Sequence, residues 1–131
     1  MVTLDEARKI IAAAEKEAHN QGQPMNIAVV DEGGNLVAFA RMDKAWLGSI
    51  DISMKKAWTS RAFDIDTKTL STVTQPGQDF YGLHVSNNGK VMIFAGGVPL
   101  KRGGAVAGAI GVSGGSGKQD HAVAEAGAKA F

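Results

Sequence analysis

The feature that most constrains this chain is a glycine-rich turn in its second half, between an apolar run and a helical pattern. The apolar run covers residues 105–110, and the turn follows as Gly111-Val112-Ser113-Gly114-Gly115-Ser116-Gly117. Ser116 and Gln119 form a capping box, which predicts a final helix running to about Lys129. A strand, a glycine turn and a helix start bring backbone N–H groups and a helix dipole together, an arrangement that suits an anion or a polar ligand group.

The turn imitates two catalytic motifs and satisfies neither. A phosphate-binding loop would need a glycine at Val112 and a hydroxyl at Gln119. A nucleophile elbow fits around Ser113, but the one later histidine, His121, lies on the same short helix as the later acids, too close for a triad. We therefore expect a structural turn, with ligand contacts still open to Ser113, Gly114, Gly115, Ser116, Gln119, Asp120 and His121.

Length and composition exclude several classes of protein. A chain of 131 residues suits one domain over residues 1–131, and 44% hydrophobic residues can form a real core. A net charge of +1 and few aromatic residues give no case for binding nucleic acid. No apolar run is long enough to span a membrane, and no signal peptide opens the chain. With no cysteine, disulfides and thiolate sites are excluded, and a cytoplasmic location is expected.

The pattern of apolar residues predicts an α+β fold. Thr3 and Glu6 form a capping box that starts a first helix, and Gly22 is its natural end. The whole order is α-β-β-α-(α)-β-β-β-α, and the short links between strands predict a five-stranded antiparallel sheet flanked by helices. The predicted strands are 26–30, 35–42, 91–94, 98–101 and 105–112, and the middle helices are 50–63 and a short piece within 64–74.

The last predicted strand has one face made only of small residues. If its side chains alternate, Val106, Ile110 and Val112 share a face with Gly108, and the other face carries Ala105, Ala107, Ala109 and Gly111. Such a flat face accepts a closely packed neighbour. A helix of the same chain is the expected neighbour, with a partner subunit and a planar ligand as alternatives.

These segments resemble the GlcG/HbpS family, which includes the C-terminal domain of PduO adenosyltransferases. The resemblance rests on segments spread in the right order over almost the whole chain: residues 28–36, 56–59, 62–63, 96–100, 103–104, 108–115 and 119–120. It implies a profilin-like sheet flanked by helices. It also implies a homo-oligomer, which could be an octamer. Members occur as haem-binding proteins and beside glycolate or propanediol catabolism, so the resemblance favours a small-ligand-binding function, with haem or another tetrapyrrole first.

The resemblance also suggests an iron ligand. His19 lies near the end of the first helix, about 100° from the centre of its apolar stripe, with Glu15 one turn earlier. PduO-type domains carry a histidine at a similar place, which makes His19 the candidate axial ligand of haem iron, against the alternative of a surface histidine favoured by the helix dipole. Lys101 and Arg102, at a predicted hairpin end, could neutralise haem propionates or an acid substrate, or could simply be solvated.

The other two histidines leave alternatives open. His84 follows Phe80 and Tyr81, which could line a flat pocket but are expected to fill the core. His121 could contact a ligand as a neutral imidazole or stay solvated. No HExxH or HxxxH spacing is present, so a dedicated metal site is not expected.

A second function stays open beside haem binding. It is that of an accessory enzyme or detoxifying protein for a small carboxylic acid of glycolate, diol or aromatic catabolism, bound where Ser113, Gln119, Asp120 and His121 meet. No catalytic residue is assigned. A structural oligomer without a ligand is the third alternative.

Overall fold

The first helix starts and ends where the sequence predicts. In the computed structural model, which describes residues 1–131, helix α1 spans Leu4–Gln21. The Thr3 hydroxyl accepts a hydrogen bond from the Glu6 amide, and the Glu6 carboxylate accepts one from the Thr3 amide. Gly22 ends the helix at φ 68°, a conformation that glycine adopts without strain. The predicted capping box and stop residue are thus confirmed.

The sheet has four strands, all antiparallel to their neighbours. They are β1 (Asn26–Asp31), β2 (Leu36–Arg41), β3 (Gly97–Arg102) and β4 (Ala105–Ser113), and they lie side by side in the order β2-β1-β4-β3. The hairpins β1–β2 and β3–β4 form the two halves, and the pairing of β1 with β4 joins them. The α+β class and the antiparallel sheet are confirmed, and the predicted count of five strands is wrong.

The strand predicted at residues 91–94 does not form. The backbone of this segment is satisfied by side chains instead of by a neighbouring strand. The Met92 amide donates to Thr59 Oγ1 at 2.9 Å, and the Ile93 carbonyl accepts from Gln75 at 3.3 Å. Because Val91 is fully buried, the apolar run that suggested a strand anchors an irregular connection instead.

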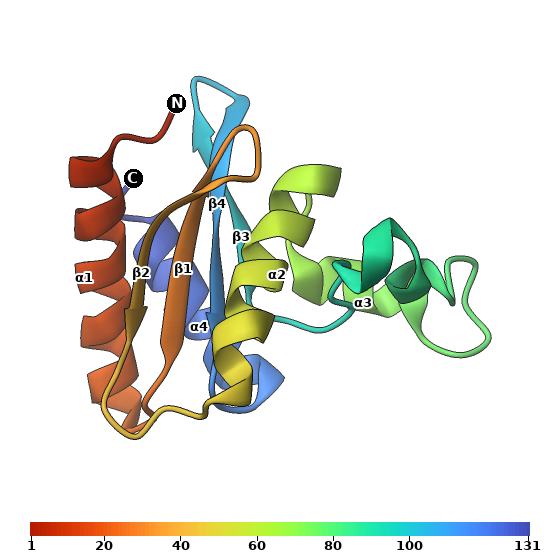
Figure 1. The fold of residues 1–131 in the computed structure, drawn as a ribbon, viewed down its shortest axis with the longest axis horizontal. Helices are drawn as coiled ribbons and strands as arrows, with labels where there is room; N and C mark the ends of the chain where they lie inside the picture. The colour runs from red at the N-terminus through yellow and green to blue at the C-terminus, as the bar shows by residue number, and fades with distance from the viewer.

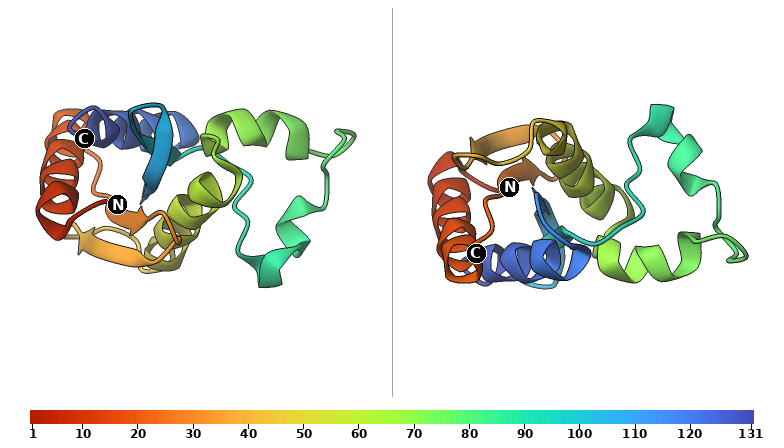
Figure 2. Two further views of the ribbon diagram at one scale, coloured as in Figure 1. Left: turned by 90° about the horizontal axis from the view of Figure 1, so that it is seen from above. Right: turned by 90° about the horizontal axis from the view of Figure 1, so that it is seen from below.

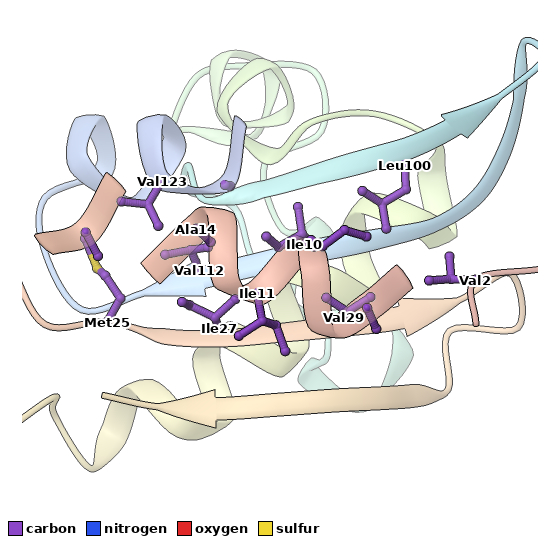
Figure 3. Close-up of a cluster of buried hydrophobic side chains, with 14 of the residues drawn as sticks. Val2, Ile10, Ile11, Ala14, Met25, Ile27, Val29, Leu100, Val112 and Val123 are labelled. Carbon is purple, nitrogen blue, oxygen red and sulfur yellow. The ribbon is translucent and has the colours of Figure 1, made fainter. Parts of the chain in front are cut away.

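Helices cover both faces of the sheet. The remaining helices are α2 (Gly48–Phe63), α3 (Thr67–Thr74) and α4 (Gly117–Ala128), with two single 3-10 turns at Leu83–Val85 and Asn87–Gly89. Helices α1 and α4 lie on one face and α2 on the other (Figure 1). The main core fills the space between the sheet and α1 and α4, with Ile10, Ile27 and Val112 fully buried at its centre (Figure 3).

The small-residue face of β4 packs against a helix of the same chain, as expected. A Cβ built on Gly111 would lie 2.0 Å from the Ser53 carbonyl of α2, and Ala109 is buried beside Ala57. Ala107 departs from the prediction. The β3–β4 register shifts between Leu100 and Lys101, which makes Ala107 the extra residue of a bulge, and it joins the main core on the opposite face.

Residues 75–90, which we call the arm, project from one end of the molecule beyond the sheet (Figure 2). The expectation that its aromatic residues fill the core is wrong: Phe80 and Tyr81 are 57% and 59% exposed, and Val85 is exposed as well. An exposed apolar arm of this kind is typical of a segment that contacts another molecule. None of the helices is both long and apolar enough to cross a membrane.

Candidate functional site

His19 lies on an open groove of about 500 Å³ at the C-terminal end of α1. The groove runs between this end of the helix and the connection from β2 to α2, and Glu15 lines it beside His19. His19 is exposed, so its imidazole is accessible to a ligand. Ala18, Ala40 and Met42 give the groove a limited apolar floor. The position of His19 at the solvent boundary is as predicted.

The cations of this groove are not the predicted ones. Arg41 and Lys44, at the end of β2 and just beyond it, line the groove with His19. Arg102 instead pairs with Glu6, in the first turn of α1, and its guanidinium covers the Phe131 ring at 4.5 Å. Glu6 lies 13 residues before His19 on the same helix, which is about 20 Å at 1.5 Å per residue. The structure therefore does not bring Lys101 and Arg102 to the His19 groove.

The glycine turn binds an anion that the chain itself supplies. Asp120, in the first turn of α4, accepts a hydrogen bond from the Gly115 amide at 2.9 Å. Ser116 and Gln119 form the predicted capping box. Because its N–H groups meet the Asp120 carboxylate and the Gln119 side chain, internal contacts occupy the turn, which is where the alternative function would bind a small acid.

The partner of Asp120 is Lys56 of α2, a residue without any role among the predicted site residues. The Lys56 Nζ lies 2.8 Å from Asp120 Oδ2 and donates to the Val112 carbonyl at 2.9 Å. The side chains are 1% and 4% exposed. Burial lowers the pKa of Lys56 and raises the pKa of Asp120, and the attraction within the pair opposes both shifts. The pair ties α2, the end of β4 and the start of α4 together.

A sequence signal for Lys56 does exist. The buried positions of α2 fall on one side of the helix, and all but one of them are polar: Ser49, Ser53, Lys56, Ala57, Thr59 and Ser60. A lysine on a helix face that contains only small residues is positioned to reach a buried partner. A hydroxyl on this face also binds a buried partner on β4: Ser49 Oγ accepts a hydrogen bond from Ser113 Oγ at 3.1 Å.

His121 and His84 lie away from the groove. His121 Nε2 is 3.1 Å from Glu125, one turn later on α4. His84 belongs to the arm, where its ring meets Tyr81 edge to face at 5.7 Å. In each ring Nδ1 is buried without a hydrogen-bond partner. No three histidine or acidic side chains gather where a metal ion could be held.

One residue links the glycine turn to the His19 groove. Gln23 lines the groove, and its side-chain amide donates to the Gly114 carbonyl at 2.7 Å. A Cβ on Gly114 would lie 2.6 Å from the Pro24 carbonyl, so the turn lies directly behind this wall of the groove. Of the predicted site residues, Gly114 lies behind the Gln23–Pro24 wall of the groove that His19 lines, and Lys101, Arg102 and His121 lie elsewhere.

The fold and the groove together define a small α+β domain with a histidine at the rim of an open, mixed-polarity groove. Residues 2–129 match the family model described as haem degrading protein HbpS-like. The chain belongs to this HbpS-like family.

Individual relatives agree with this assignment. An uncharacterised 15.0 kDa protein from the dhaT–dhaS intergenic region of Citrobacter freundii is 41% identical over 124 residues, covering 95% of this chain and 87% of that protein. The crystal structure of Klebsiella pneumoniae protein ORFY superposes with a TM-score of 0.96 at 39% identity, covering 99% of this chain and 90% of that one. The haem complex of PduOC gives 0.92 at 37% identity, covering 97% and 92%. The resemblance found in the sequence is confirmed.

Proposed function

We propose that this protein binds haem or a related tetrapyrrole in the His19 groove, with His19 as the axial ligand of the iron. The observation that carries the proposal is the accessible imidazole at the rim of a groove of about 500 Å³. A histidine nitrogen is the usual protein ligand of haem iron. The haem complex of PduOC, a structure with the same fold, supports the choice of ligand.

The residues of the groove fit the chemistry of the group. The iron would supply the acceptor for an imidazole nitrogen. His19 forms no salt bridge with a carboxylate, whereas His121 does, so His19 is free to bind a ligand. We assign the neutralisation of carboxylates at the rim to Lys44 and Arg41 instead of Lys101 and Arg102, and the Arg41 guanidinium also donates to the Ala45 carbonyl. Ala18, Ala40 and Met42 offer the apolar contact for one edge of the ring.

A homo-oligomer is the second part of the proposal. The groove is open, and its few apolar residues cover only part of a flat ring. The arm exposes Phe80, Tyr81 and Val85, and Trp46 and Leu47 are exposed in the connection from β2 to α2. Contact between copies would remove these residues from water. A stable interface buries about 1,000 Å² or more. Light scattering at micromolar protein should return a multiple of 13.6 kDa, and a monomer mass would reject this part.

A haemin titration of the parent and of three single variants tests the binding site. The parent should show a saturable Soret band. His19→Ala should change the band and weaken binding roughly 30- to 1,000-fold, as expected for loss of about 2–4 kcal/mol. His84→Ala and His121→Ala are matched controls and should bind like the parent. An unchanged His19→Ala spectrum and affinity would remove His19 from the site, and no saturable binding by the parent would remove haem.

A further inference from the structure

A second groove lies on the far side of the molecule, around Trp58 of α2. One half, of about 180 Å³, is lined by Val30, Leu36 and Met54. The other half, of about 280 Å³, is bordered by Glu32, Gly33 and Arg61. Trp58 and Gly34 line both halves, so the two hollows lie next to each other around the indole. Trp58 belongs to α2, and α2 lies on the opposite side of the sheet from α1, the helix that carries His19 (Figure 1).

The backbone of the β1–β2 hairpin is shaped to the indole. Gly34 has φ 76°, and a Cβ built on it would lie 2.9 Å from Trp58 Cδ1. A side chain at this position would collide with the ring. The indole Nε1 edge lies beside the same glycine, where its N–H can donate to a ligand oxygen.

The charges at the apolar half of this groove favour an anionic ligand, because its charged lining residues are the cations Lys55 and Lys90. Lys55 pairs with Asp51, and Arg61 pairs with Asp64. Lys90 has no carboxylate within 4.0 Å, and its ammonium instead lies over the Trp58 ring, 5.3 Å from the centroid. The Lys90 side chain is exposed, while its backbone is held by Thr59 Oγ1, which donates to the Lys90 carbonyl at 3.2 Å. A flexible cation is thus anchored at the mouth of an apolar slot.

We propose that this groove binds a small planar aromatic carboxylate, independently of haem at the His19 groove. The ring lies in the apolar half against Trp58, and Val30 and Met54 supply its floor. Lys90 moves off the indole face and pairs with the carboxylate, which exchanges a weak cation–π contact at an exposed site for a charge-assisted hydrogen bond. The contact with the Trp58 ring selects an aromatic ligand, and the charge of Lys90 selects a carboxylate.

Fluorescence of Trp58 provides the test. The chain has two tryptophans, so a Trp46→Phe background leaves Trp58 as the reporter. Benzoate should quench it saturably with a Kd of roughly 1 mM, which is reasonable for so few ligand atoms. Benzamide, of the same shape and without charge, should bind about fivefold more weakly.

Two variants complete the experiment. Lys90→Gln should weaken benzoate binding about fivefold and leave benzamide unchanged, whereas Lys9→Gln, on exposed α1, should change neither. His19→Ala should bind benzoate like the parent, so failure of the haem site and failure of this site are distinguishable. Absence of saturable quenching up to about 10 mM would overturn the proposal. Equal benzoate affinity in the parent and Lys90→Gln would overturn it as well.

Discussion

The Lys56 ammonium lies 2.8 Å from the Asp120 carboxylate, and both side chains are almost completely removed from water. A charge in such a place is tolerated only when its partner and further hydrogen bonds are present. Lys56 also donates to Val112, and Asp120 accepts from Gly115. This pair therefore fixes the glycine turn behind the His19 groove by internal contacts, and the turn is part of the scaffold.

Removal of Lys56 should destabilise the fold strongly. Lys56→Met leaves the Asp120 carboxylate buried without its counter-charge, and we expect a loss of about 3–5 kcal/mol in the free energy of unfolding. Urea denaturation measures this loss. Lys55→Met, one residue away, is the control: its partner Asp51 is on the surface, and the loss should stay below about 0.5 kcal/mol. Similar losses in the two variants would mean that the buried pair contributes no more to the free energy of unfolding than the surface pair does.

The stability of Lys56→Met should depend on pH with a defined sign. Burial raises the pKa of Asp120 above 3.8, and without Lys56 the opposing attraction is gone, so the pKa rises further. Between about pH 4 and this raised value the folded state binds more protons than the unfolded state, and the free energy of unfolding falls as pH increases. In the double variant Lys56→Met/Asp120→Asn, the free energy of unfolding should no longer fall with pH over this interval. A free energy of unfolding of Lys56→Met that rises through the same interval would contradict the assignment.

The close contact of α2 with β4 predicts the effect of a single methyl group. Gly111→Ala would place a Cβ 2.0 Å from the Ser53 carbonyl and 2.4 Å from the Ala57 amide, so α2 must shift. We expect a loss of about 2–3 kcal/mol or more. Gly117→Ala is the matched control. Its Cβ would meet only Ala95, at 3.5 Å, in the first turn of α4, and stability should stay within about 1 kcal/mol of the parent. Thermal denaturation of both variants measures the difference. If Gly111→Ala were as stable as Gly117→Ala, the close contact between α2 and β4 would be refuted.

The two capping boxes should contribute equally. Thr3→Ala and Ser116→Ala each remove the side-chain acceptor of the N–H three residues later, in α1 and α4. Each should cost about 1 kcal/mol of unfolding free energy. Thr3→Ser and Ser116→Thr keep a hydroxyl and should retain most of the stability. Unchanged denaturation midpoints in the alanine variants would show that these helices do not depend on their caps.

Local sequence signals determined much of this fold. The caps at Thr3 and Ser116, the stop at Gly22 and the hairpin positions depend on contacts within a few residues, and the structure has them all. The face of β4 that carries only small residues also predicted a closely packed neighbour, and that neighbour is α2. In each case the physical cause lies in the segment itself: an unpaired helix N–H, a left-handed backbone or an absent side chain.

Tertiary structure alone decided the rest. Val91 is buried as its apolar run suggested, but Thr59 and Gln75 take the backbone bonds that a fifth strand would have needed. Arg102 meets Glu6 at the far end of α1 from His19, while Arg41 and Lys44 reach the groove. Lys56 and Asp120, 64 positions apart, meet only when α2 and α4 both pack against β4. A sequence shows which side chains need a partner. Long-range packing decides which residue becomes that partner, and it thereby determines the site.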